Sequence, residues 1–121
     1  MKVRTSIAVM FAGLVLAGGV LAQDFKKMGG MMVNGAGMTL YTFDRDTGGK
    51  SACNGPCTAN WPPAMAGADA KVSGDWTIIT RDDGAKQWAY KGKPVYTWSK
   101  DAKPGDMTGD GFNGTWHVVK D

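Results

Sequence analysis

The sequence predicts an all-β fold: a small antiparallel β domain built from two pseudo-symmetric repeats with long Gly-rich loops, after an N-terminal signal helix. Three observations support this prediction. An aromatic motif occurs twice at constant spacing, all five tryptophans lie beyond residue 22, and no long apolar helical stretch follows that point. Such a composition, with frequent glycines between short aromatic segments, is typical of a turn-rich β domain.

The first 22 residues have the three parts of a secretory signal peptide. Lys2 and Arg4 precede a fifteen-residue apolar run from Ile7 to Leu21, and the small residue Ala22 stands before polar sequence. The run is shorter than the roughly 18–20 residues that span a bilayer. We therefore expect cleavage after Ala22 rather than a membrane anchor. No cysteine lies near this position, so there is no lipobox Cys for lipid attachment.

Removal of the signal leaves 99 residues, enough for one domain. We expect a flexible leader at 23–30 and a single β domain at 31–121, with repeat 1 at about 31–66 and repeat 2 at about 75–121. Loss of two of the 14 basic residues leaves 12 against 11 acidic ones, a net charge of +1. This balance gives no support for nucleic-acid binding or for a basic membrane-binding surface. The predicted location is periplasmic or secreted.

Two stretches of the form Tyr-x-aromatic-x-x-Asp lie 55 residues apart, and a tryptophan follows each aspartate after fifteen residues. The matching positions are Tyr41, Phe43, Asp46 and Trp61 in the first copy and Tyr96, Trp98, Asp101 and Trp116 in the second. Two ungapped copies indicate one strand–loop–strand unit present twice. Two units are too few for a solenoid, so a closed pseudo-symmetric domain is expected.

Local signals agree with this arrangement. Expected strands lie at 38–43, 76–80, 86–90, 94–98 and 115–119. Asp82-Asp83-Gly84 and Lys91-Gly92 are hairpin turns. Residues before proline avoid the helical region, so Trp61-Pro62-Pro63 is extended. Long Gly-rich loops are expected at 47–60 and 102–114.

These features occur together in a known family. The two motifs, the Cys53-Asn-Gly-Pro-Cys57 loop, Trp61-Pro-Pro63 and the Gly/Asp-rich segment from Pro104 to Val118 stand in the same order. From about Met31 to Val119 the chain resembles the bacterial secreted repeat family with a Y-x4-D motif, also described as predicted lipoproteins with a conserved YxFxxD motif. The resemblance implies an envelope or secreted location and a duplicated β-rich repeat, with no established activity.

The eight motif residues admit two interpretations. In the first, each aspartate accepts hydrogen bonds from loop N–H groups, while each tyrosine places its ring in the core and its hydroxyl at the edge. In the second, the two carboxylates face each other as a metal site or an acid/base pair. We favour the structural role, because it needs no ligand and explains why the pattern occurs twice. No catalytic constellation is found, so an enzyme is not expected.

Cys53 and Cys57 are an even pair in an exported chain, which favours a structural disulfide. The alternative is a thiol redox protein. Three residues separate the cysteines and one of them is Pro56, unlike the Cys-x-x-Cys motif of redox dithiols.

Methionines provide the other alternative. Met31, Met32 and Met38 lie close together in the sequence, and soft thioethers with His117 are ligands that suit Cu(I). The simpler interpretation is that these methionines fill a small core.

We therefore expect an exported non-catalytic β-repeat module that binds an envelope partner or small ligand and needs no cofactor. Trp61 and Trp116 in aromatic-rich loops are candidate contact residues if they are exposed. An envelope copper-binding protein is the alternative, and a thiol redox protein is a third.

Overall fold

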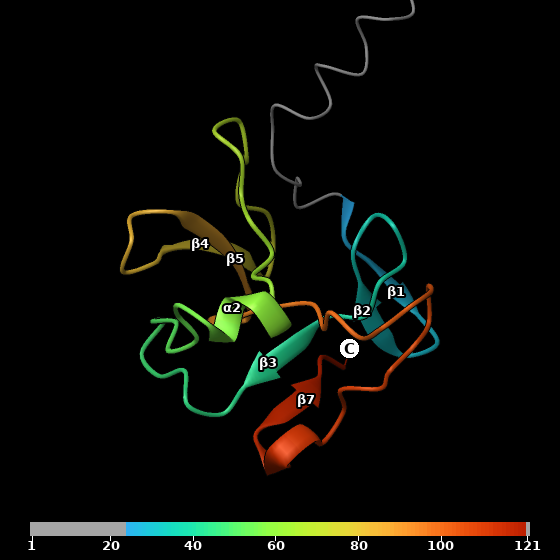
Figure 1. Ribbon diagram of the computed structural model, residues 1–121. Helices are drawn as coiled ribbons and strands as arrows, with labels where there is room; N and C mark the ends of the chain where they lie inside the picture. Colours follow the sequence, from blue (N-terminus) through green and yellow to red (C-terminus); the bar gives the residue numbers. More distant parts are fainter. Residues whose placement is uncertain (1–23, 121) are drawn as a thin grey trace, which may run out of the picture.

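The computed structural model describes residues 24–120 (Figure 1). The signal peptide and signal helix predicted before Gln23 lie outside the described residues. The elements in chain order are β1 (Lys26–Met28), β2 (Met31–Val33), β3 (Tyr41–Phe43), α2 (Cys57–Asn60), β4 (Trp76–Thr80), β5 (Lys86–Tyr90), β6 (Lys93–Pro94), η3 (Phe112–Gly114) and β7 (Trp116–Val118).

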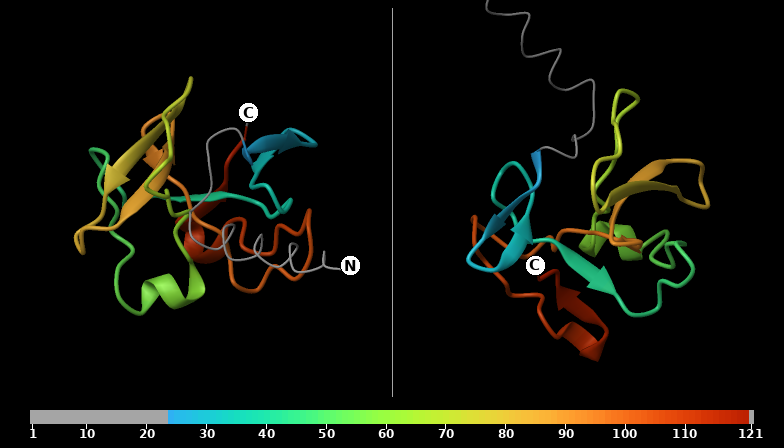
Figure 2. Two further views of the ribbon diagram at one scale, coloured as in Figure 1. Left: turned by 90° about the horizontal axis from the view of Figure 1, so that it is seen from above. Right: turned by 180° about the vertical axis from the view of Figure 1, so that it is seen from behind.

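The strands form small antiparallel sheets, as the sequence predicts. β1 pairs with β2, β3 pairs with β7, and β4, β5 and β6 form a three-stranded sheet in that order. The β1–β2 and β4–β5 hairpins lie on opposite sides of the β3–β7 pair in all three views (Figures 1 and 2). Within residues 24–120, no helix is long and apolar enough to cross a membrane.

Strand positions match the prediction in part. β4 and β5 have the expected bounds, and the turn between them contains Asp82-Asp83-Gly84. The expected strand at 94–98 is instead β6 at 93–94 followed by an isolated bridge at Tyr96. The loop predicted at 47–60 ends in the single-turn helix α2.

β structure begins before residue 31, the expected start of the β domain. The structure places residues 26–28 in β1, and Phe25 is buried against Trp76 with ring centroids 4.0 Å apart. All three β1 side chains are exposed. A three-residue strand with exposed side chains has no apolar alternation, which is the signal that reveals strands in a sequence.

The two repeats are interlocked through their strands. Tyr41 and Tyr96, at equivalent positions, exchange both backbone hydrogen bonds, at 2.8 and 2.9 Å. β3 of the first repeat pairs with β7 of the second, and in the same way Tyr96 pairs with Pro63 of the first. Each motif strand is therefore completed by the closing segment of the other repeat.

Further backbone bonds repeat this exchange with the same spacing. The Asp44 N–H donates to the Thr115 carbonyl at 2.8 Å, and the Ser99 N–H donates to the Asn60 carbonyl at 2.9 Å. Adding 55 to residues 44 and 60 gives 99 and 115, so the two bonds are equivalent contacts, one made by each repeat. The domain thus has a local pseudo-twofold axis at the Tyr41–Tyr96 pair.

Strand alternation divides the core in two. Consecutive side chains of a strand point to opposite faces, so Leu40 and Tyr41 enter different clusters, as do Val95 and Tyr96. One cluster contains Phe25, Met32, Leu40, Trp76, Trp88, Tyr90, Val95 and Val119. The other, around the pseudo-twofold axis, contains Met31, Val33, Tyr41, Cys53, Trp61, Tyr96, Trp98, Trp116 and Val118.

Candidate functional site

Each motif tyrosine bonds to the aspartate of the other repeat. The Tyr41 hydroxyl donates to Asp101 Oδ2 at 2.8 Å, and the Tyr96 hydroxyl donates to Asp46 Oδ2 at 2.8 Å. Both tyrosines are fully buried. A buried hydroxyl or carboxylate is costly unless it is hydrogen-bonded, so each repeat satisfies the polar groups of the other. The sequence did not reveal this crossing, because equal spacing within each copy does not show which copy a side chain contacts.

The motif aromatic residues form one continuous stack across the axis. Trp61 and Trp116 lie face to face, with centroids 3.8 Å apart and planes 1° apart. Phe43 stacks on the far side of Trp116 at 4.2 Å, and Trp98 stacks on the far side of Trp61 at 4.0 Å. Trp61 and Trp116 are only 4% and 3% exposed. The two tryptophans therefore do not meet the condition of exposure under which they would be contact residues, and they belong to the core.

Comparison with known families agrees with the duplicated geometry. The family described as a secreted repeat of unknown function matches residues 25–65 and again residues 77–120. The chain belongs to this family. Its two matches cover the two interlocked copies, and the family description supports an exported location. No curated protein and no solved structure matches the chain.

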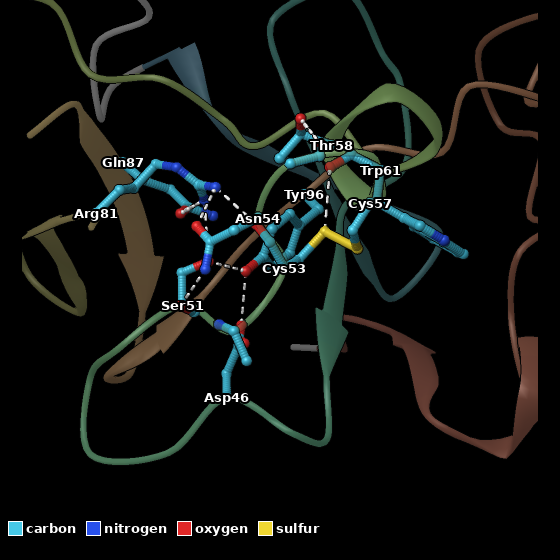
Figure 3. The surroundings of a disulfide bond; sticks show 12 residues. Asp46, Ser51, Cys53, Asn54, Cys57, Thr58, Trp61, Arg81, Gln87 and Tyr96 are labelled. Atoms are coloured by element: carbon cyan, nitrogen blue, oxygen red, sulfur yellow. Dashed lines mark hydrogen bonds between the residues drawn. A yellow bond between two sulfur atoms is a disulfide. The ribbon is translucent and has the colours of Figure 1, made fainter. Parts of the chain in front are cut away.

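In this secreted-repeat protein, the loop after the first motif is fixed by a buried arginine (Figure 3). Arg81, 5% exposed, lies directly after β4 and donates to Ser51 Oγ at 2.9 Å and to the Cys53 carbonyl at 2.6 Å. It also donates to Gln87 Oε1 at 2.7 Å and Asn54 Oδ1 at 3.0 Å. One guanidinium therefore holds the second repeat's hairpin against the first repeat's loop.

Two hydroxyls connect this arginine to the motif. Ser51 Oγ lies 2.5 Å from the Tyr96 hydroxyl. Arginine can only donate and an ionised carboxylate can only accept, so the hydroxyls between them are directed from Arg81 through Ser51 and Tyr96 to Asp46. This chain joins a buried positive group to a carboxylate without a direct ion pair, and polarisation along it strengthens each bond.

The disulfide lies in the same loop. Cys53 and Cys57 are bonded, as predicted from their even count in an exported chain. Cys53 is fully buried in the cluster at the axis, and Cys57 opens α2. The redox alternative is not tested by this geometry and stays a prediction.

The loop after the second motif uses different groups. Asp101 Oδ1 accepts bonds from the Thr108 N–H at 2.9 Å and the Thr108 hydroxyl at 2.6 Å. The Gly109 N–H donates to the Tyr41 hydroxyl at 3.2 Å. A Cβ at Gly109 would lie 2.7 Å from Trp61 and 2.9 Å from Trp98, so only glycine lets the backbone lie against the aromatic stack.

Burial shifts the protonation of the motif groups. It raises the pKa of Tyr41 above its usual range, and the hydrogen bond to Asp101 adds to the rise. Burial also raises the pKa of Tyr96 to about 12, with a further contribution from the charge of Asp46. The pKa of Asp46 is raised by burial, against the opposing effect of the Ala52 N–H bond at 2.6 Å. At neutral pH both tyrosines are therefore protonated and donate to the aspartates.

A hollow lined by lysines lies beside the β3–β7 pair. It has a volume of about 390 Å³, and its basic residues are Lys91, Lys93, Lys120 and His117. Lys91 and Gly92 form the two-residue turn between β5 and β6 with φ of 52° and 84°, which matches the primed turns of tight hairpins. The sequence did not reveal this hollow, because its lysines come from two separate segments, the β5–β6 hairpin and the C-terminal end of the described chain. The Lys91-Gly92 turn was the one available signal.

The predicted copper ligands are not brought together. Met31 and Met32 point to opposite faces of β2 and enter different clusters. His117 is exposed on β7, where Nε2 lies 2.9 Å from Asp44 Oδ2. Among residues 24–120, no three His, Cys, Asp or Glu side chains are grouped to hold a metal ion.

Proposed function

We propose that the protein is an exported, non-catalytic binding module whose lysine-lined hollow takes a carboxylate-rich ligand or partner of the cell envelope. In this proposal the Tyr-x-aromatic-x-x-Asp motif, which the sequence resemblance attributes to the family, serves architecture. The motif hydroxyls and carboxylates are bonded to each other across the repeats, which leaves them unsuited to acid/base chemistry.

The observation that carries the proposal is the local charge of the hollow. Lys91, Lys93 and Lys120 line it, and all three are exposed. Among the described residues that line the hollow, the one carboxylate is that of Asp44, and His117 engages it at 2.9 Å. The surface thus has an excess of ammonium groups around a concavity, although the whole exported chain is almost neutral. Concentrated charge of this kind attracts anionic partners and orients them.

Apolar surface accompanies the charge. The hollow is also lined by Tyr90, Val118 and Val119, and the Lys91 ammonium lies 5.4 Å from the centroid of the Tyr90 ring. A binding site with apolar walls and a few placed polar groups is the usual form of a ligand site. A volume of about 390 Å³ fits one or two acidic residues of a peptide, so the fitting ligand is short and carboxylate-rich.

Titration with a short oligoglutamate tests this proposal, with amide chemical shifts as the readout. Lys91→Gln, Lys93→Gln and Lys120→Gln should each weaken binding several-fold. Lys100→Gln is the matched control, because Lys100 is exposed, carries the same charge and does not line the hollow. Equal losses for Lys100→Gln and the three hollow variants, or shifts centred elsewhere, would show attraction without a site and contradict the proposal.

A further inference from the structure

The β1–β2 hairpin places two methionines side by side. Met28 and Met31 are partners in the strand register on either side of a Gly29-Gly30 turn, whose φ values are 61° and 87°. Positive φ at both turn residues defines the tight hairpin that glycine favours. Directly opposed residues lie on the same face with Cβ atoms about 4.5–5.5 Å apart, so the two thioethers share one side of the hairpin.

A third methionine reaches the same place from the second repeat. Met107, from the loop after the second motif, lines one hollow of about 580 Å³ together with Met28 and Met31. Thr39 links these segments, because its hydroxyl donates to the Asp106 carbonyl at 2.6 Å and lies 3.8 Å from Met31 Sδ. The sulfur of Met31 is therefore close to the backbone that carries Met107.

Access to the hollow comes from its rim. Met107 and Met28 are 51% and 37% exposed, whereas Met31 is 9% exposed. Two flexible thioethers thus border solvent, while the third is held in place by the core.

We propose that Met28, Met31 and Met107 form a binding site for Cu(I). Thioethers are soft ligands that select Cu(I), whereas none of the described residues that line this hollow has a carboxylate or imidazole to attract harder ions. Both cysteines are in the disulfide, so no thiolate among the described residues competes for the ion. This ligand set differs from the alternative considered from sequence, since it keeps Met31, leaves out Met32, Met38 and His117, and adds Met28 and Met107.

One positive group lies nearby. Lys120 is exposed and lines both hollows, the one that contains Met28, Met31 and Met107 and the one that contains Lys91 and Lys93. An exposed ammonium is screened by water and salt, and its long side chain reaches either hollow. The site goes beyond the proposed function, because Cu(I) binding by thioethers does not depend on an anionic ligand in the lysine hollow.

The test is an anaerobic Cu(I) titration of the purified exported protein against a chromophoric Cu(I) chelator. The variants are Met28→Leu, Met31→Leu and Met107→Leu, which keep the side-chain volume. Changes around a metal's ligands cost about 10- to 100-fold in affinity, so loss of one ligand should weaken binding by about tenfold or more. Met65→Leu is the matched control, because Met65 is 39% exposed and does not line this hollow.

Methionine methyl NMR with Ag(I), a redox-inert substitute for Cu(I), provides a second readout, which identifies the ligands without a measurement of affinity. We expect the methyl signals of Met28, Met31 and Met107 to shift, while those of Met32 and Met65 stay in place. Equal effects of Met65→Leu and the three site variants, shifts at Met32, or retained affinity in the triple variant would overturn the proposal.

Discussion

The two loops that follow the motifs both donate hydrogen bonds to a motif aspartate, but different groups hold each loop in place. In each copy, a loop N–H donates to Oδ1 of the motif aspartate, and the tyrosine hydroxyl of the other repeat donates to Oδ2. The first loop depends on a buried arginine and a disulfide. The second depends on the Thr108 hydroxyl and on the close approach of Gly109 to the tryptophans.

This difference shows which part of the structure the duplication fixes. The backbone exchange, the Tyr–Asp bonds and the aromatic stack are the same in both copies and lie at the pseudo-twofold axis. The groups that support them from outside differ. Both proposed binding hollows border the cluster at the axis, because Val118 lines both of them and Met31 lines one. Their lysines and their exposed methionines come from outside that cluster, so symmetry provides the scaffold and the segments around it provide these groups.

The largest effect is expected from Arg81→Met, which removes the support of the first loop alone. Four hydrogen bonds to buried or half-buried acceptors are lost, so the free energy of unfolding should fall by about 3 kcal/mol. Urea denaturation measures this. Arg45→Met is the control, because Arg45 is exposed, and an equal fall in that variant would mean that loss of charge rather than loss of the network is responsible.

Gly109→Ala tests the second loop in the same way. The new Cβ would lie 2.7 Å from Trp61, which requires the aromatic stack or the loop to move, at about 2 kcal/mol. Thermal unfolding and tryptophan fluorescence report the change. Gly35→Ala is the comparison, since its Cβ would meet Asp24 at an ordinary 3.4 Å. Unchanged stability of the Gly109→Ala variant would contradict the assigned close approach.

Loss of the disulfide should have a smaller effect than loss of Arg81. The cysteines are only four residues apart, so their bond restricts the unfolded chain little. We expect Cys53→Ala with Cys57→Ala to lower the free energy of unfolding by about 2 kcal/mol or less. A fall larger than that of Arg81→Met would reverse the assigned order of the two supports.

The last effect is the titration of the buried tyrosines, which changes nothing at neutral pH and lowers stability only in alkali. Tyr96 has an ordinary pKa of 10.0 and a folded pKa of about 12, so its contribution is complete below pH 10 and is lost as the pH rises through 12. The raised pKa of Tyr41 acts in the same direction. Urea midpoints measured across this range should fall, and Tyr41→Phe with Tyr96→Phe should flatten the fall. If the urea midpoint of the double variant falls by the same amount, titrating groups other than these tyrosines cause the loss of stability.

The sequence predicted the architecture better than the contacts. Repeated aromatic and acidic positions at a spacing of 55 identified the duplication, and turn residues such as Lys91-Gly92 located hairpins. The crossing of Tyr41 to Asp101 was not predictable, because spacing along the chain is identical whether repeats pack separately or exchange strands. Arg81 was missed for a related reason: a single arginine after a strand has no pattern, and three of its four acceptors lie 27 to 30 residues away in sequence.

The methionines of the proposed Cu(I) site show the same limit of prediction from sequence. Neighbours in sequence such as Met31 and Met32 are separated by strand alternation, whereas Met28 and Met107 come together only through the fold. The sequence suggested methionines as soft ligands, but which of them line one hollow depends on tertiary structure.

The central claim is that each tyrosine stabilises the other repeat rather than its own. Double-mutant cycles on Tyr41 test it directly, with Tyr41→Phe combined in turn with Asp101→Asn and with Asp46→Asn. The crossed pair Tyr41 and Asp101 should show a coupling energy of about 1 kcal/mol in urea denaturation, and Tyr41 with Asp46 of its own repeat should show almost none. Strong coupling to Asp46 with none to Asp101 would contradict the interlocked structure.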